Sequence, residues 1–162
     1  LNLPDFRANE KTYQLISQVS GRAGRSKTPG KVIIQTYNPD NYSIELSKTH
    51  NYVDFFNKEI KIRKDLKYPP YYFISLIKIG SKDYNLSLNE SKKIANYIKE
   101  NISEDMIVLG PSVSGVSRVN KIYYFQIIIK FRNKEKMREI LNNVSDLENN
   151  NKVSISIDIN PC

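Results

Sequence analysis

The sequence predicts an α+β protein in two parts: a short α/β segment, then a ferredoxin-like α+β domain with helices on one face of an antiparallel-rich sheet. Three observations lead to this prediction. Residues 31–37 hold a nearly continuous β-branched run, which is typical of a buried parallel strand. Residues 45–162 alternate between helical and strand periodicity. Between these patterns, Asn38-Pro39-Asp40-Asn41 breaks the chain, so we place a boundary near residue 44 and assign residues 1–44 and 45–162 to two domains.

The first domain contains one predicted helix and one predicted strand. Apolar residues recur at helical spacing over residues 9–20, and we expect Gly21 and Gly24 to end this helix. The positions expected to face inward are Tyr13, Ile16 and Val19. The strand follows at residues 31–37. One helix and one strand cannot bury a core alone, so we expect them to be the trailing edge of a larger sheet.

The second domain begins with helical periodicity over residues 52–66, which Pro69 and Pro70 end because proline cannot continue a helix. Residues 71–81 then alternate as a strand. The string Ser87-Leu88-Asn89-Glu90 has the form of a capping box, in which the serine and glutamate side chains satisfy backbone N–H groups. We therefore expect a helix from this string to about residue 101.

The sequence of residues 107–159 predicts the remaining strands of the second domain and one more helix. Residues 107–119 read as one strand or two, interrupted by Gly110-Pro111. Residues 121–131 have the strongest strand pattern, and Asn133 can cap the helix that follows. Residues 153–159 alternate perfectly as a last strand. One face of the strongest strand is expected to carry Tyr123, Phe125, Ile127, Ile129 and Phe131.

Composition narrows the function classes. The 162 residues include 25 Lys and Arg against 17 Asp and Glu, a formal net charge of +8, so the surface should attract polyanions, nucleic acid first. The single cysteine, Cys162, excludes an internal disulfide and a cysteine-built zinc site and fits a reducing cytosol. No apolar run approaches the roughly 20 residues that span a bilayer, and no signal peptide is present. We expect a cytoplasmic protein, and the start at Leu1 without methionine suits a piece of a longer chain.

The string Gln18-Val19-Ser20-Gly21-Arg22-Ala23-Gly24-Arg25 carries the strongest functional signal. Each arginine follows a glycine, so both guanidinium groups can approach a neighbouring backbone and present bidentate donors to phosphate oxygens. By composition alone, a solvated basic turn would have the same residues. The pattern Gln-x-x-Gly-Arg-x-Gly-Arg resembles the last conserved motif of superfamily 2 helicases, on the second of their two RecA-like lobes. This resemblance implies that the arginines reach across the interlobe cleft to the triphosphate of ATP.

The flanking strings extend the resemblance over essentially the whole chain. In order and spacing they are similar to the C-terminal part of the bacterial replication-restart helicases, the primosomal protein N′ family. The strings are Leu3-Pro4-Asp5-Phe6-Arg7-Ala8-Asn9-Glu10, Gly30-Lys31-Val32-Ile33-Ile34-Gln35-Thr36-Tyr37-Asn38-Pro39, Arg63-Lys64-Asp65-Leu66-Lys67-Tyr68-Pro69-Pro70, Val108-Leu109-Gly110-Pro111 and Ile157-Asp158-Ile159-Asn160-Pro161.

The resemblance implies an ATP-dependent 3′→5′ DNA helicase that recognises stalled or branched forks and restarts replication by primosome assembly. Residues 1–44 would then be the end of helicase lobe 2. ATP and Mg²⁺ would be held mainly by other regions, because this sequence has no Gly-x-x-x-x-Gly-Lys-Ser/Thr loop. Zinc is expected only in a cysteine-rich insertion outside this sequence, and no metal site within it. The fragment alone should neither hydrolyse ATP nor unwind DNA.

Within the motif, the resemblance makes Arg25 the candidate arginine finger. Arg22 would bind the same phosphates or tie the turn to the first lobe, and the two roles could be exchanged. An arginine that completes an ATP site across a cleft contributes roughly three to five orders of magnitude to turnover. The nucleotide-binding residues implied are Gln18, Gly21, Arg22, Gly24 and Arg25.

A basic cluster at the start of the last helix is a second candidate site. Glu135 and Glu139 interrupt it, which favours a solvated face. The resemblance suggests a use, because that family's C-terminal domain contacts branched and single-stranded DNA and the acidic tail of single-stranded-DNA-binding protein, alongside other primosome proteins. The cluster consists of Lys130, Arg132, Lys134, Lys136 and Arg138.

Two alternatives to a helicase part remain open at this point. A stand-alone nucleic-acid-binding module would stack unpaired bases on sheet aromatics such as Tyr71 and Tyr123, although packing within the domain explains those aromatics better. A protein-docking module would contact DNA little. Both would have the ferredoxin-like fold and no catalytic activity.

Overall fold

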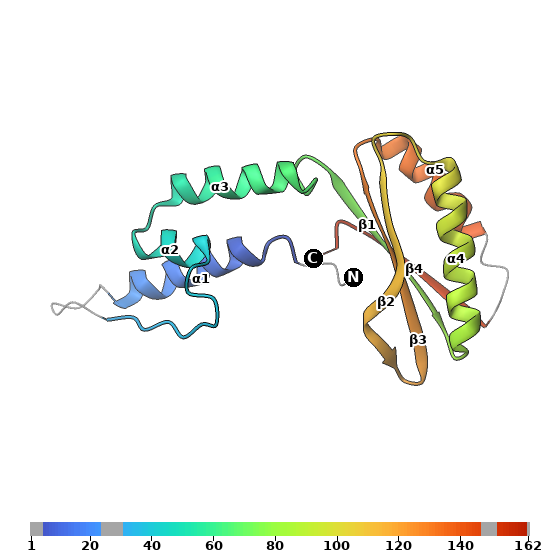
Figure 1. The fold of residues 1–162 in the computed structure, drawn as a ribbon, viewed down its shortest axis with the longest axis horizontal. Coiled ribbons are helices and arrows are strands. Elements are labelled where there is room, and N and C mark those ends of the chain that lie inside the picture. Colours follow the sequence, from blue (N-terminus) through green and yellow to red (C-terminus); the bar gives the residue numbers. More distant parts are fainter. Residues whose placement is uncertain (1–4, 24–30, 147–151, 162) are drawn as a thin grey trace. The chain divides into compact units, whose positions relative to one another are not determined.

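The computed structural model describes residues 5–23, 31–146 and 152–161 of the chain (Figure 1). The described chain divides between Leu66 and Lys67 into two compact units. We call the part up to Leu66 the helical unit and the part from Lys67 the sheet unit.

The helical unit contains α1 (Ala8–Ala23), α2 (Tyr42–Lys48) and α3 (Tyr52–Asp65). α1 and α3 were predicted, but α1 continues through Gly21, one of the two glycines expected to end it, to Ala23. The other, Gly24, lies outside the described residues. Glycine costs a helix only about 1 kcal/mol relative to alanine, so it does not end a helix by itself. The sequence pattern did not indicate α2, which is too short to show a period. It begins because Asn41 accepts a hydrogen bond from the backbone N–H of Ser43 (2.9 Å).

A small shared core holds these three helices together. Tyr13 of α1, Ile44 of α2 and Phe55 of α3 are 5%, 7% and 3% exposed. A division near residue 44 would cut through this core, and the two compact units instead separate after Leu66. The break at Asn38-Pro39-Asp40-Asn41 differs from a linker because it leads directly into the cap of α2.

Residues 31–37 form no strand in the described structure, contrary to the prediction. Ile33, Ile34 and Tyr37 are 82%, 39% and 109% exposed. A buried parallel strand is stabilised by neighbouring strands and by covering helices. The described helical unit offers no strand to pair with, so the β-branched run forms no regular secondary structure, and Ile33 and Ile34 are exposed.

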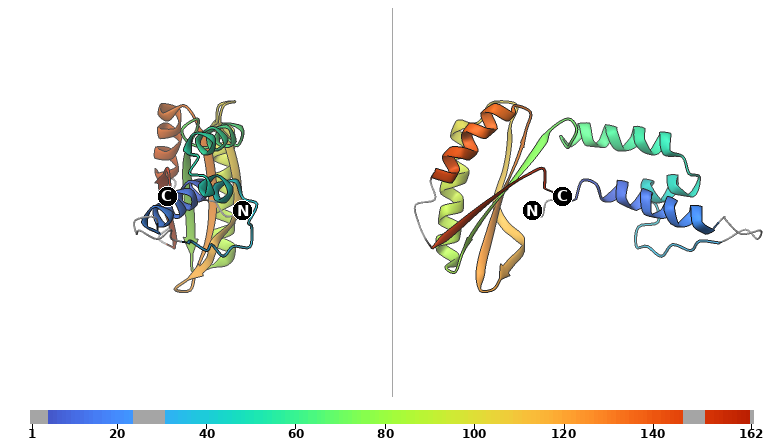
Figure 2. Two further views of the ribbon diagram at one scale, coloured as in Figure 1. Left: turned by 90° about the vertical axis from the view of Figure 1, so that its left-hand side faces the viewer. Right: turned by 180° about the vertical axis from the view of Figure 1, so that it is seen from behind.

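The sheet unit has the predicted ferredoxin-like architecture. Its elements in chain order are β1 (Phe73–Ser81), α4 (Tyr84–Asn101), β2 (Ile107–Val119), β3 (Ile122–Phe131), α5 (Lys134–Asp146) and β4 (Val153–Ile159). The strands lie in the order β2-β3-β1-β4, and every neighbouring pair is antiparallel. α4 and α5 both cover the same face of this sheet (Figures 1 and 2). β2 is a single strand whose register with β3 shifts between Leu109 and Ser112.

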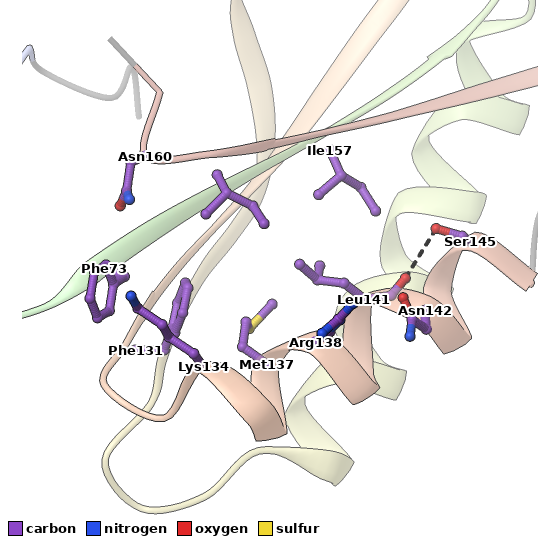
Figure 3. A pocket seen from close by; sticks show the side chains of 11 residues that line it. Phe73, Phe131, Lys134, Met137, Arg138, Leu141, Asn142, Ser145, Ile157 and Asn160 are labelled. Carbon is purple, nitrogen blue, oxygen red and sulfur yellow. Dashed lines mark hydrogen bonds between the residues drawn. The ribbon is translucent and has the colours of Figure 1, made fainter.

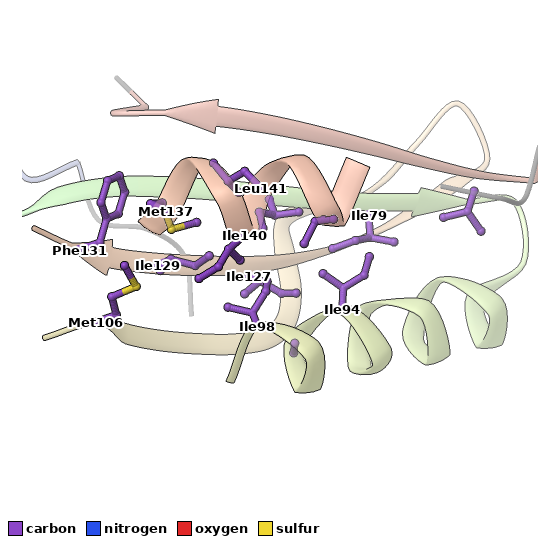
Figure 4. Packing of buried hydrophobic residues seen from close by; sticks show 14 residues of the cluster. Ile79, Ile94, Ile98, Met106, Ile127, Ile129, Phe131, Met137, Ile140 and Leu141 are labelled. Atoms are coloured by element: carbon purple, nitrogen blue, oxygen red, sulfur yellow. The ribbon is translucent and has the colours of Figure 1, made fainter. Parts of the chain in front are cut away.

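The core of the sheet unit lies between this sheet face and the two helices (Figure 4). Ile77 of β1 pairs with Ile127 of β3 on one side and Ile157 of β4 on the other, so isoleucines line up across three strands. Helix residues such as Ile98 and Ile140 complete the cluster and are at most 1% exposed. The face predicted for β3 is confirmed where Ile127, Ile129 and Phe131 enter this core.

The helix caps correct one prediction and confirm another. α4 starts at Tyr84, because Asp83 accepts hydrogen bonds from the backbone N–H groups of Asn85 (2.8 Å) and Leu86 (3.1 Å). Ser87 is therefore not a cap: its hydroxyl is buried and donates to the carbonyl of Ile79 (3.0 Å). Asn133 accepts from the backbone N–H of Lys136 (3.0 Å), as a cap of α5 should.

Candidate functional site

The first candidate site is one exposed face of α1. Leu15, Gln18, Val19 and Arg22 follow one another at spacings of three, four and seven residues from Leu15, so their side chains share one side of the helix. All four are exposed, including Leu15 at 61% and Val19 at 52%. We call these four residues the motif face. Val19 thus lies outside the core, although the sequence placed it inward with Tyr13 and Ile16.

The opposite side of α1 is fixed against α3. The ring of Tyr13 stacks on the ring of Phe55, with centroids 4.3 Å apart and an interplanar angle of 18°. The carboxylate of Glu10 accepts a hydrogen bond from the guanidinium of Arg63 at 2.8 Å. Glu10 and Tyr13 are three residues apart and share a side of the helix. The motif face therefore points away from the contacts that hold α1 in place.

The described structure covers only part of the predicted arginine motif. Gln18, Gly21 and Arg22 lie on α1, whereas Gly24 and Arg25 lie outside the described residues. Arg22 occupies the last turn of α1, where a cation is favoured by the partial negative charge of the free carbonyls. A methyl group on Gly21 would meet no other heavy atom within 4 Å.

The second candidate site, the basic cluster of the sheet unit, is divided by the fold. Lys130 is buried at 8% exposure, with its ammonium 3.7 Å from the ring centroid of Tyr68. Burial lowers the pKa of Lys130, and the nearby charge of Lys67 lowers it further. The exposed Arg132 lies over the ring of Tyr72 at 5.6 Å. These groups surround the junction of β3 and β1 rather than forming a stripe on α5.

The remaining members of the cluster lie on α5. Lys136 pairs with Glu139 at 3.1 Å, and the ammonium of Lys134 lies 4.2 Å from the ring centroid of Phe73. Arg138 is exposed on the same helix. Glu139 therefore pairs with Lys136, whereas Lys134 and Arg138 both line the side of α5 that faces β1 and β4.

A groove of about 580 Å³ runs beside these two cations, between α5 and strands β1 and β4 (Figure 3). Its apolar lining comes from Phe73, Phe131, Met137, Leu141, Ile157 and Ile159. Lys134 and Arg138 supply positive charge along it, and Asn142, Ser145 and Asn160 supply polar groups. The sequence analysis missed this groove because it depends on the pairing of Ser75 with Ile159, which brings β4 beside α5.

The sheet aromatics pack within the unit, as the sequence analysis favoured. Tyr84 meets Tyr123 edge-on at 5.6 Å and Phe125 at 5.4 Å. Phe125 is 3% exposed. Because Phe125 is buried, its ring has no open face on which a base could stack, which disfavours the stacking alternative there.

Neither unit offers a metal site or a membrane span among the residues that are described. No group of three or more His, Cys, Asp or Glu side chains there could hold a metal ion. In the same part of the chain, no helix combines the length and apolar character needed to cross a membrane.

Comparisons with a family model and with individual known proteins indicate the same family. Residues 64–162 match the family model for the primosomal protein N C-terminal domain. The chain is 42% identical over 166 residues to replication restart protein PriA of Bacillus subtilis, covering 99% of this chain and 20% of that protein. It is 38% identical over 135 residues to its namesake in Chlamydia trachomatis, covering 82% and 18%, and 32% identical over 162 residues to that of Borreliella burgdorferi, covering 99% and 24%. The chain thus spans about a fifth of the length of these relatives.

Proposed function

This chain belongs to the PriA family of replication restart proteins, and from that membership we propose that it is the C-terminal part of an ATP-dependent 3′→5′ DNA helicase. In this proposal the whole protein recognises stalled or branched forks in the bacterial cytoplasm and restarts replication by primosome assembly. The observation that carries the proposal is the motif face, which presents Gln18 and Arg22 on the exposed side of a helix anchored from behind.

The motif face completes an ATP site whose other wall lies outside this sequence. ATP with Mg²⁺ supplies the phosphoryl-transfer chemistry there, held mainly by the first helicase lobe. Gln18 orients the nucleotide, and Arg22 and Arg25 donate to phosphate oxygens as negative charge develops on them. Among the described residues, no carboxylate pairs with the exposed guanidinium of Arg22, which suits this role.

The fold supports a DNA contact at the edge of the sheet unit. Arg132 is exposed and lies over Tyr72, and the ammonium of Lys67 lies 5.7 Å from the same ring. No ion pair with a carboxylate holds either cation within the described residues, so both charges are available for phosphates. Lys130 contributes to the positive potential here but, being buried, makes no direct contact.

The groove beside α5 is the site we propose for a protein partner, the acidic tail of single-stranded-DNA-binding protein. Its apolar lining accommodates a large hydrophobic side chain of the partner. Lys134 and Arg138 line the same groove and pair with carboxylates of the acidic segment. A groove of this kind combines burial of an anchor residue with charge complementarity at its rim.

DNA-stimulated ATP hydrolysis by the full-length protein tests the proposal. The intact protein should hydrolyse ATP and unwind DNA in the 3′→5′ direction, whereas this 162-residue chain alone should do neither. Arg25→Ala in the full-length protein should abolish turnover and leave DNA binding largely intact, and Lys61→Ala on the exposed side of α3 should change neither. Full turnover by Arg25→Ala would remove the finger assignment.

A further inference from the structure

Arg63 of α3 binds carboxylates on two different helices. Its Nε donates to Oε1 of Glu59, one turn earlier on α3, at 2.7 Å. Its terminal nitrogen donates to Oε2 of Glu10 on α1 at 2.8 Å. The guanidinium also lies 5.3 Å from the ring centroid of Phe6, just before α1. One planar cation therefore joins the start of the motif helix to the end of α3.

This network is largely withdrawn from solvent. The side chains of Arg63 and Glu59 are 13% and 9% exposed, and the hydroxyl of Tyr42 on α2 donates to the second oxygen of Glu59. Burial raises the pKa of Tyr42, and the hydrogen bond to Glu59 raises it further, so the phenol stays protonated. The Glu10 side chain is the exposed end, at 39%. The hydrogen-bonded chain thus contains one group each from α1 and α2 and two groups from α3.

The geometry decides what the network does for α1. The stacked rings of Tyr13 and Phe55 set the separation of α1 and α3. α1 also packs against α2, where the side-chain amide of Asn41 donates a hydrogen bond to Asn9 at 3.2 Å. Arg63 attaches α1 to α3 a second time, one turn before the stacked ring, and this link further restrains rotation of α1 about its axis. Charge-assisted hydrogen bonds are directional, and the fork of an arginine fixes the direction of each. Rolling of α1 would move the motif face, which lies on the opposite side.

We propose that Arg63, through Glu10, is a positioning residue for the ATP site: it sets the rotation of α1 and so the direction in which Gln18 and Arg22 point. This inference rests on the proposed function. Arg63 does not touch nucleotide. It acts through a helix, and a displaced arginine stabilises the developing charge less well even when ATP still binds.

The test uses the full-length protein with Glu10→Gln and Arg63→Lys, and Glu45→Gln as the matched control. Glu10→Gln keeps shape and removes the charge of the exposed end. Arg63→Lys keeps the positive charge but replaces the planar guanidinium by a compact ammonium. The ammonium cannot donate directed hydrogen bonds to both carboxylates in one plane. Within the described part of the chain, Glu45 pairs only with Lys48 on its own helix, so Glu45→Gln is the same change without a link between helices.

We expect Glu10→Gln and Arg63→Lys to lower kcat roughly 10- to 100-fold with little change in KM for ATP, and Glu45→Gln to match the wild type. Because the residues act as one unit, the double variant should lose no more than the worse single variant. Ile44→Val, which weakens the same core without touching the network, gives the turnover expected from lost stability alone.

Two results would overturn the inference: turnover of Glu10→Gln equal to that of Glu45→Gln, or a loss no larger than that of Ile44→Val at an equal drop in melting temperature. The variants Arg22→Ala and Arg25→Ala distinguish failure of the inference about Arg63 from failure of the proposed function. If both retain full turnover, the ATP-site proposal itself fails. If they lose turnover and Glu10→Gln does not, only the role of Arg63 is wrong.

Discussion

The stacked rings of Tyr13 and Phe55, with centroids 4.3 Å apart, determine which side of α1 is buried. Because this contact and the Glu10–Arg63 ion pair occupy the same side of the helix, Gln18 and Arg22 emerge on the other. The exposure of Gln18 and Arg22 is thus a consequence of how the helix packs.

Phe55→Ala should unfold the helical unit selectively. Loss of a buried phenylalanine costs about 3–5 kcal/mol, through lost burial and the cavity left behind. Hydrogen exchange resolved by mass spectrometry should show the loss of protection in α1 and α3 and little change in the sheet unit. Phe56→Ala, one position along and 48% exposed, should change stability by no more than about 0.5 kcal/mol. Equal effects of the two variants would contradict the observed packing.

Ile127→Ala should destabilise the sheet unit by about 2–5 kcal/mol, because Ile127 is fully buried between the sheet and its two helices. Urea unfolding followed by circular dichroism measures this change. Ile159→Ala removes the same atoms from a position 57% exposed and should cost far less. An unchanged free energy of unfolding for Ile127→Ala would contradict the core described for the sheet unit.

Arg138→Glu should weaken binding of the acidic tail peptide of single-stranded-DNA-binding protein about 10-fold, or about 1.4 kcal/mol. The reversal places a carboxylate beside the apolar groove where an acidic ligand needs a cation. Fluorescence anisotropy of a labelled peptide reports the change. Lys92→Glu makes the same reversal on the exposed side of α4. If both variants bind the peptide equally, the groove is not its site.

Stability of the helical unit should fall as the pH rises above about 10, in part because of Tyr42. Burial and then the hydrogen bond to Glu59 raise the pKa of this phenol in the folded state. A group whose pKa is raised by folding contributes its full stability below the pKa of the unfolded chain and loses it at higher pH. Comparison of wild type with Tyr42→Phe from pH 8 to 11 should show an advantage of the wild type that shrinks above pH 10. Tyr37→Phe, at a fully exposed tyrosine, should show no such trend.

Much of the sheet unit could be predicted because its elements have long, regular patterns. β4 alternates in sequence over its full length, β3 is rich in β-branched and aromatic residues, and α5 begins directly after the asparagine that caps it. The start of α4 was misplaced because Asp83 and Ser87 are both acceptable caps in sequence. Only the folded structure shows that Asp83 caps the helix and that the Ser87 hydroxyl instead donates a hydrogen bond to the carbonyl of Ile79 in β1.

The helical unit was harder to predict because its structure depends on contacts between distant residues. The β-branched run at 31–37 has strand propensity but no neighbouring strand among the described residues. The link between Glu10 and Arg63 spans 53 residues, and nothing in either local sequence indicates it. The groove beside α5 likewise combines residues of β1, β3, β4 and α5. In the sequence, its apolar lining residues have the same pattern as residues of the buried core.

Single-turnover ATP hydrolysis by the full-length protein carrying Arg22→Lys tests the central claim most directly, namely that the exposed face of α1 completes an ATP site. Lysine keeps the charge and most of the length of the side chain but not the fork that binds two phosphate oxygens. The account predicts a rate at least about 10-fold lower with nearly unchanged affinity for ATP, and no effect of Lys61→Arg. A rate for Arg22→Lys equal to that of the wild type would contradict it.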